Sequence, residues 1–203
     1  MPHDDAMTLV DHPTLRRLRS ALATRPAALA PDDGAPRRAA VAVVLRHSAD
    51  DVVELLLIKR SEREGDPWSG QIALPGGRQD PVDATLQETA IRETREETGI
   101  DLARDGVVLG MLDELRPRTP VLPPIIVTPF VTVVRADVSI ETSDEVAAAF
   151  WVSLASLADP SLAVESDVTA RGTTWRVPSY LLGGHIVWGM TERILRNLLL
   201  VLG

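Results

Sequence analysis

The chain has 203 residues, which suits one domain with short extensions. Hydrophobic residues make up 45% of the sequence, enough for a packed core, although aromatic residues contribute only 3% and aliphatic side chains must supply most of the packing. The formal net charge of -8 argues against a nucleic-acid-binding protein, because such proteins need a basic surface. The absence of cysteine excludes disulfides, thiol catalysis and cysteine-bound zinc.

The sequence also bears on the compartment in which the protein works. Its first ten residues are acidic and lack the positive region and apolar stretch of a secretory signal. No uninterrupted apolar run reaches the roughly 18 residues that a membrane-spanning helix needs. The longest run without charge, residues 119–134, contains four prolines. We therefore expect a cytoplasmic protein that binds no membrane and no nucleic acid.

The first element expected along the chain is a helix over residues 12–25, where leucines recur at helical spacing. Asp11 is its expected N-cap. Residues 26–36 are rich in proline and alanine and predict a loop. The sequence thus predicts an N-terminal helix and linker over residues 1–36, followed by the main domain over residues 37–203.

The main domain begins with two aliphatic runs, at residues 39–46 and 52–59, which predict a β-hairpin. A loop rich in glycine and proline follows over residues 61–83. Residues 84–98 form the clearest helix in the sequence, with Asp83 as the expected N-cap and Gly99 as the expected stop.

Three more strands are expected at residues 106–114, 125–134 and 147–153, and a short turn or helix at 155–158. Residues 173–177 have the pattern of a further strand. From His185 onward, apolar residues at helical spacing predict a closing amphipathic helix. This order of elements predicts an α/β fold with a mixed sheet and helices packed on its faces.

The helix at 84–98 carries more charge than packing requires. Glu93, Glu96 and Glu97 stand at positions i, i+3 and i+4 and share one face, where like charges repel. A solvated face with ion pairs, such as Glu88 with Arg92, explains part of this charge. Divalent cations offer the alternative explanation, because hard cations such as Mg²⁺ prefer carboxylate oxygens. A glycine-rich loop stands immediately upstream, where backbone N–H groups can approach a phosphate.

Residues 77–100, GRQDPVDATLQETAIRETREETGI, resemble the Nudix box, in which a glycine, a spacer and an acidic residue precede Arg-Glu-apolar-x-Glu-Glu-x-Gly-apolar. The first half departs from the general pattern, since the acidic residue is Asp83 and the segment to Arg92 is one residue longer than usual. The resemblance implies a Nudix-type α/β/α sandwich with a mixed β-sheet and helices on both faces.

These departures resemble the coenzyme A pyrophosphatase branch of that family. Three segments carry the similarity: residues 75–85 (PGGRQDPVDAT), 56–61 (LLIKRS) and 186–191 (IVWGMT). The upstream signature of the branch is incomplete here, because its second arginine is absent in register and Arg63 is the nearest one. The resemblance covers roughly residues 39–200.

The resemblance implies a divalent-metal-dependent hydrolase that uses Mg²⁺ or Mn²⁺. Glu93, Glu96 and Glu97 would hold the metal and take part in catalysis, and Arg92 would orient a carboxylate. One of the glutamates, or a later acidic residue, would activate water. Glu145 or Glu141 is a candidate for that further ligand or base, with a surface carboxylate as the alternative.

Substrate binding is implied for a second set of residues. The backbone at Gly76 and Gly77 would approach the diphosphate, and arginines would bind phosphates. The arginine candidates are Arg60, Arg63 and Arg78, each with a surface role as the alternative. Arg116 and Arg118 follow a strand and either contact the nucleotide or cover a sheet edge. The four histidines, His3, His12, His47 and His185, show no ligand-like spacing in the sequence.

Coenzyme A or an acyl-coenzyme A is the leading substrate, cleaved to phosphopantetheine and adenosine 3′,5′-bisphosphate. The alternative within the enzyme class is a pyrophosphatase acting on ADP-ribose, NADH or another nucleoside diphosphate derivative. A catalytically silent nucleotide-binding module is a third possibility, which the presence of all three helix glutamates disfavours. The partner in each case is a small nucleotide, and a homodimer is compatible with the apolar helices at the two ends of the chain.

Overall fold

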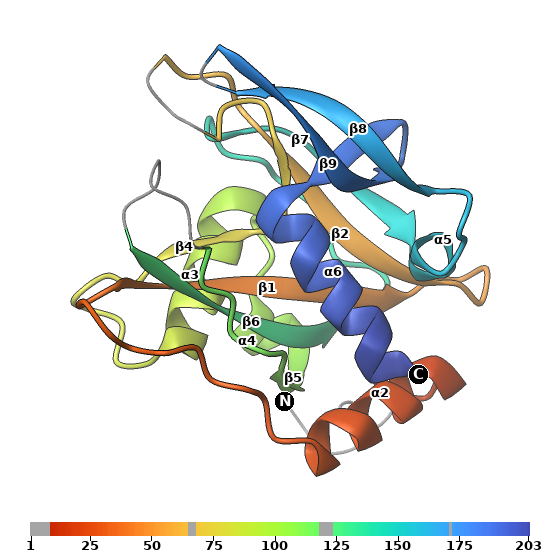
Figure 1. Ribbon diagram of the computed structural model, residues 1–203. Coiled ribbons are helices and arrows are strands. Elements are labelled where there is room, and N and C mark those ends of the chain that lie inside the picture. The colour runs from red at the N-terminus through yellow and green to blue at the C-terminus, as the bar shows by residue number, and fades with distance from the viewer. Residues whose placement is uncertain (1–8, 65–67, 118–123, 171) are drawn as a thin grey trace.

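The computed structural model describes residues 9–64, 68–117, 124–170 and 172–203. Within them a mixed sheet of seven strands forms the centre of the molecule, and a second sheet of three strands lies beside it (Figure 1). The helices described are α2 (Pro13–Thr24), α3 (Leu86–Thr98), α4 (Leu102–Asp105), α5 (Leu154–Leu157) and α6 (Gly189–Leu202). No helix among these residues is long and apolar enough to cross a membrane.

The strands of the large sheet are β1 (Arg37–His47), β2 (Val53–Arg60), β3 (Ile72–Ala73), β4 (Gly76–Arg78), β5 (Gly106–Met111), β6 (Ile125–Val134) and β7 (Val146–Ser153). The small sheet contains β8 (Ala163–Ala170), β9 (Thr173–Leu182) and β10 (His185–Trp188). β1 runs parallel to β6, and the other pairs are antiparallel, which makes the large sheet mixed. β4 and β2 share one edge of β1, because β4 pairs with residues 39–41 and β2 with residues 45–47.

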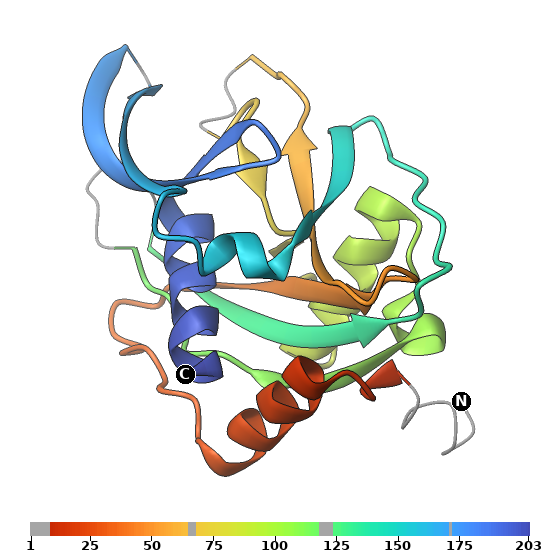
Figure 2. The same ribbon diagram turned by 90° about the vertical axis from the view of Figure 1, so that its right-hand side faces the viewer.

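Side chains of β1 alternate between two hydrophobic clusters, as the period of a strand requires. Ala40, Ala42 and Val44 face a smaller cluster that contains Ala90 of α3. The larger cluster lies on the other face and takes Val43 and Leu45 from β1, together with leucines from α2 and α6. Figure 2 shows α3 on one side of the sheet and α6 on the other. The predicted α/β/α arrangement is therefore confirmed.

The N-terminal helix packs into this larger core. Leu15, Leu18 and Leu22 of α2 are buried among residues of β5 and α6. The predicted N-cap was wrong by one residue: His12 accepts a hydrogen bond from the Thr14 N–H, and Asp11 instead pairs with Arg16. The division of the chain at residue 36 stays a prediction, with β1 beginning at Arg37.

Several predicted boundaries differ from the structure. The closing helix begins at Gly189 and not at His185, because residues 185–188 pair with β9 as β10. The expected strand at 173–177 extends to Leu182, and its partner β8 was not predicted. The strand expected at 106–114 ends at Met111. The hairpin at 39–46 and 52–59, the strands at 125–134 and 147–153, and the short helix near 155–158 are confirmed.

Candidate active site

The carboxylate-bearing helix α3 is fixed at both ends by its own sequence. Its N-cap is Thr85, whose hydroxyl accepts from the Glu88 N–H while the Glu88 carboxylate accepts from the Thr85 N–H. This reciprocal capping box satisfies two helix-end donors. Gly99 ends the helix in the left-handed conformation at φ 74°. The predicted stop is confirmed, whereas the predicted N-cap, Asp83, was wrong because that carboxylate binds Arg92 instead.

Glu97 is the most deeply buried of the three helix glutamates. Its side chain is 5% exposed. One carboxylate oxygen accepts from the Gly76 N–H at 2.9 Å, and the other lies 3.9 Å from Nη1 of Arg60. Burial raises the pKa of Glu97 to about 7, against the opposing effects of the Gly76 hydrogen bond and Arg60. The negative charges of Glu93 and Glu145 raise the pKa further. Glu97 is therefore poised between its two protonation states near neutral pH.

Glu93 lies against the glycine strand β4. A Cβ added at Gly77 would stand 2.4 Å from the Glu93 carboxyl carbon, so any other residue there would push this carboxylate aside. Gly76 is constrained more strictly, since it has φ 148° and its Cβ would stand 2.3 Å from the Ala40 carbonyl oxygen of the backbone. Burial also raises the pKa of Glu93, while the hydrogen bond from Arg92 lowers it. Glycine at these two positions lets the strand and the carboxylates meet.

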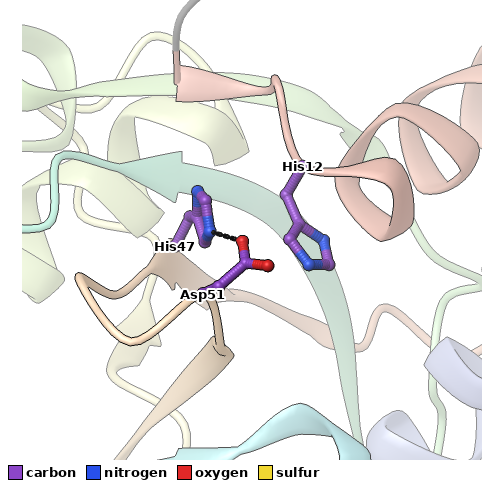
Figure 3. A group of neighbouring side chains, drawn as sticks. All are labelled: His12, His47 and Asp51. Atoms are coloured by element: carbon purple, nitrogen blue, oxygen red, sulfur yellow. Dashed lines mark hydrogen bonds and ion pairs between the residues drawn. The ribbon is translucent and has the colours of Figure 1, made fainter.

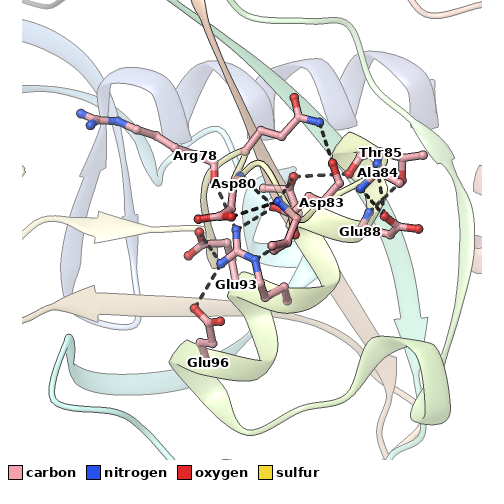
Figure 4. Close-up of polar contacts among 12 residues, drawn as sticks. Arg78, Asp80, Asp83, Ala84, Thr85, Glu88, Glu93 and Glu96 are labelled. Carbon is pink, nitrogen blue, oxygen red and sulfur yellow. Dashed lines mark hydrogen bonds and ion pairs between the residues drawn. The ribbon is translucent and has the colours of Figure 1, made fainter.

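Arg92 joins this cluster to the loop before the helix through hydrogen bonds to Asp83, Glu93 and Glu96, which Figure 4 labels. Its guanidinium donates two hydrogen bonds to Asp83, from Nε at 2.9 Å and from Nη2 at 2.8 Å. Nη1 donates to Glu93 at 2.9 Å and to Glu96 at 3.2 Å. The paired hydrogen bonds from Arg92 hold the pKa of the buried Asp83 well below its usual range. Arg92 thus orients two of the three helix glutamates and is itself fixed by Asp83.

Glu96 differs from the other two glutamates in exposure. Its side chain is 60% exposed, against 19% for Glu93 and 5% for Glu97. In Figure 4 Glu96 extends from the outer side of α3, below Glu93. The three carboxylates therefore form a graded series from the interior to solvent.

The arginines predicted to bind phosphate occupy different positions. Arg60, at the end of β2, faces Glu97, with Nη1 3.9 Å from one carboxylate oxygen. Arg63 pairs with Glu145 at 3.0 Å, and both side chains are about half exposed. Arg78 presents its carbonyl oxygen to Arg92, but Figure 4 shows its guanidinium extending away from the carboxylates. Two cations thus lie on the Glu97 and Glu145 side, and the third does not.

The remaining candidates lie outside this cluster. Glu141 packs against Gly99 at the end of α3. Arg116 binds the N-terminal segment through the Pro31 carbonyl and the Asp33 carboxylate, and so holds that segment against the loop after β5. Arg118 lies outside the described residues. The sequence did not identify Asp83 as the partner of Arg92. The available signal was that Asp83 is an acidic residue nine positions before the arginine.

Carboxylate and carbonyl oxygens are the donors that Mg²⁺ and Mn²⁺ prefer, and the cluster offers carboxylates from three glutamates on one helix face. Burial raises the pKa of both Glu93 and Glu97, and charge repulsion adds to it, from Glu96 and Glu145 on Glu93 and from Glu93 and Glu145 on Glu97. A divalent cation would offset that repulsion. The donor set and the mutual repulsion of its carboxylates therefore fit a hard divalent metal.

Comparisons with known proteins bear on the same residues. The family profile described as NUDIX domain matches residues 36–172. The Nudix hydrolase NudL of Photorhabdus laumondii, named as uncharacterized, is 35% identical over 144 residues, covering 70% of this chain and 74% of that protein. An uncharacterized protein of Schizosaccharomyces pombe is 37% identical over 144 residues, covering 62% of this chain but only 44% of its own length.

One solved structure supports the fold independently. A MutT/nudix family protein from Enterococcus faecalis aligns over 100% of this chain and 80% of its own, with a TM-score of 0.53 and 17% sequence identity. The match to the family profile covers more than half of the chain, and it includes the glutamate helix and the glycine strand. The chain therefore belongs to the Nudix family of hydrolases.

Proposed function

We propose that the chain hydrolyses a diphosphate linkage in a nucleotide derivative, with Glu93, Glu96 and Glu97 holding Mg²⁺ or Mn²⁺. The observation that carries this proposal is the graded carboxylate cluster facing the backbone of Gly76 and Gly77. A bound divalent cation would neutralise charge on the diphosphate and lower the pKa of a water molecule.

The residues around the cluster have distinct roles in this proposal. The Gly76 N–H fixes the orientation of the Glu97 carboxylate, and Arg92 fixes that of Glu93. Arg92 acts as a positioning residue, because its guanidinium is already bound by Asp83. Glu96, the exposed member, is the most accessible of the three to substrate and water.

Glu145 is the proposed further ligand or general base. It comes from the loop before β7, yet its charge raises the pKa of both Glu93 and Glu97, so it lies close to the cluster. Its ion pair with the half-exposed Arg63 keeps it on that side of the site. A carboxylate at this position could accept a proton from attacking water.

Coenzyme A or an acyl-coenzyme A is the substrate we propose. The support is the branch-like sequence at residues 56–61, 75–85 and 186–191, together with Arg60 and Arg63 beside the carboxylates. Coenzyme A carries a 3′-phosphate besides its diphosphate, and additional arginines suit that extra charge. The products would be phosphopantetheine and adenosine 3′,5′-bisphosphate.

A substrate panel tests both levels of the proposal. The purified chain would be incubated with Mg²⁺ or Mn²⁺ and coenzyme A, acetyl-coenzyme A, NADH or ADP-ribose, and the products resolved by chromatography. Glu97→Gln should abolish turnover, whereas Glu165→Gln, a matched change at an exposed glutamate of β8, should leave it unchanged. Turnover of ADP-ribose or NADH but not coenzyme A would reject the substrate and keep the reaction. Binding of a nucleotide without turnover of any compound would favour a silent binding module.

The 3′-phosphate offers a sharper test of substrate class. If Arg63 binds that group, Arg63→Ala should raise KM for coenzyme A much more than KM for 3′-dephospho-coenzyme A. Arg176→Ala, which removes an exposed arginine paired with Glu165 on the small sheet, serves as the matched control. Equal effects on both substrates would exclude Arg63 from 3′-phosphate recognition.

A further inference from the structure

A cluster of histidine and aspartate side chains lies away from the glutamates, where the start of α2 meets the turn between β1 and β2 (Figure 3). His12, His47 and Asp51 each offer a ligand atom there, and these atoms all lie within 4.8 Å of one another. Nε2 of His47 is 2.7 Å from Oδ1 of Asp51, and the two imidazole rings are 4.9 Å apart between centroids. Residues that are 35 positions apart in the sequence thus converge on one point.

Each of the three side chains comes from a fixed part of the backbone. His12 is the N-cap of α2, whose leucines are buried in the main core. His47 is the last residue of β1. Asp51 stands in the following turn at φ 60°, and its N–H donates to the Ser48 carbonyl. The backbone positions of the three residues are therefore set by secondary structure and turn geometry.

We infer that His12, His47 and Asp51 form a site for a borderline divalent transition ion, of which Zn²⁺ is the leading candidate. Two imidazole nitrogens and one carboxylate oxygen are a donor set that suits zinc and not magnesium, which prefers oxygen alone. Three protein ligands leave a fourth tetrahedral position for water.

The spacing of the donors is compatible with such an ion after small side-chain rotations. Zinc bonds of about 2.0–2.1 Å place tetrahedral donors roughly 3.3 Å apart, so the widest separation must close and the His47–Asp51 hydrogen bond must open. The exposed fractions of these two side chains, 34% for His47 and 84% for Asp51, leave room for this movement.

This site is distinct from the glutamate cluster. Val41 of β1 pairs with Gly76, which binds Glu97, whereas His47 lies six residues further along the same strand. Six residues of a strand span roughly 20 Å, too far for one ion or one substrate diphosphate to touch both clusters. The His-Asp site would instead tie the N-terminal helix to the hairpin turn.

Metal binding by His12 would break the hydrogen bond that caps the start of α2. Nδ1 of His12 accepts a hydrogen bond of 3.2 Å from the Thr14 N–H. This bond is lost whichever nitrogen binds metal, because Nδ1 either binds the ion or carries the proton when Nε2 does. His12→Asn is therefore a clean variant, since asparagine caps helices well and removes the imidazole.

The test is Co²⁺ and Zn²⁺ binding to the full chain, free of any purification tag, in excess Mg²⁺ to occupy oxygen-only sites. The wild type should bind one equivalent of Co²⁺ with visible d–d absorption, and Zn²⁺ should displace it. His12→Asn and His47→Asn should each weaken binding by more than roughly tenfold, a loss seen even for outer-shell partners of metal sites. His185→Asn, a histidine in β10 that contacts Phe150, should bind as the wild type does.

Thermal unfolding provides a second readout that does not depend on hydrolase activity. Zn²⁺ should raise the melting temperature of the wild type and of His185→Asn, but not that of His12→Asn, because a ligand stabilises only a fold that binds it. Unfolding in EDTA checks that each variant is folded. No Co²⁺ binding to the wild type, or equal binding by the wild type and both cluster variants, would overturn the inference.

Discussion

Replacing the buried Glu97 by glutamine should abolish hydrolysis and at the same time stabilise the fold. The pKa of Glu97 is about 7 in the folded protein, against an ordinary value of 4.5, and burial is the main cause. A carboxyl whose pKa is raised by folding binds a proton more tightly in the folded state than in the unfolded state. The free energy of unfolding therefore falls as the pH rises from about 4.5 through about 7.

The size of this effect follows from the same pair of values. At about 1.4 kcal/mol per pH unit, the difference between them corresponds to about 3 kcal/mol of destabilisation once Glu97 is ionised. Glu97→Gln removes the charge and retains an oxygen that can accept from the Gly76 N–H. Without metal, the variant should be more stable than the wild type by up to about 3 kcal/mol at pH 8, and by little at pH 4. In a chain of this length that gain raises the melting temperature by about 6–12 °C.

Denaturant unfolding in EDTA, repeated from pH 4 to pH 9, measures this difference directly. The matched control is Glu96→Gln, whose exposed side chain should change stability by less than about 0.5 kcal/mol. Added Mg²⁺ or Mn²⁺ should stabilise the wild type much more than the Glu97 variant, since only the former keeps the full carboxylate set. A variant less stable than the wild type at every pH, or a difference that does not change with pH, would refute the reasoning.

Three further changes test the cluster. Arg92→Ala leaves the buried Asp83 carboxylate unpaired and should lower the free energy of unfolding by about 3–5 kcal/mol in denaturant titrations. Because Arg92 lowers the pKa of Asp83, its stabilising effect depends on an ionised Asp83, and the loss of unfolding free energy should shrink as the pH falls below 3.8. A loss that does not change with pH would indicate that Arg92 contributes through packing alone. Gly77→Ala should displace Glu93 and weaken Mn²⁺ binding measured by calorimetry; unchanged affinity would contradict the close approach. Mn²⁺ affinity should rise between pH 6 and pH 8 with proton release, because Glu97 must ionise to bind metal, and a pH-independent affinity would count against its role.

The elements that the sequence predicted well are those whose pattern is local. The aliphatic runs of β1 and β2 and the helix ending at Gly99 depend on residues next to one another in the chain. The glutamates of α3 could be placed on one face for the same reason, because helical spacing alone decides it. For these parts the periodicity of the sequence determines the structure.

The parts that were missed depend on contacts between distant residues. Residues 185–188 fit a helical spacing, but pairing with β9 makes them a strand. β8 is hard to recognise because polar residues such as Glu165 and Asp167 interrupt its apolar ones. Asp83 is a suitable N-cap by type, but the guanidinium of Arg92 competes for its carboxylate and Thr85 takes its place. The cluster of His12 and His47 could not be found by spacing, because the two residues are far apart in the chain and meet only in the folded protein.

The energetics of α3 separate the residues that support the fold from those that serve the site. The Thr85 capping box, Gly99 and the Arg92–Asp83 pair all stabilise the helix or its junction with the loop. Glu97 does the opposite at neutral pH and above, because its ionisation in the interior costs free energy. A neutral side chain that accepts from the Gly76 N–H would serve folding better. Packing alone does not account for an ionisable carboxylate buried beside Glu93, and the proposed binding of a divalent metal by the pair does.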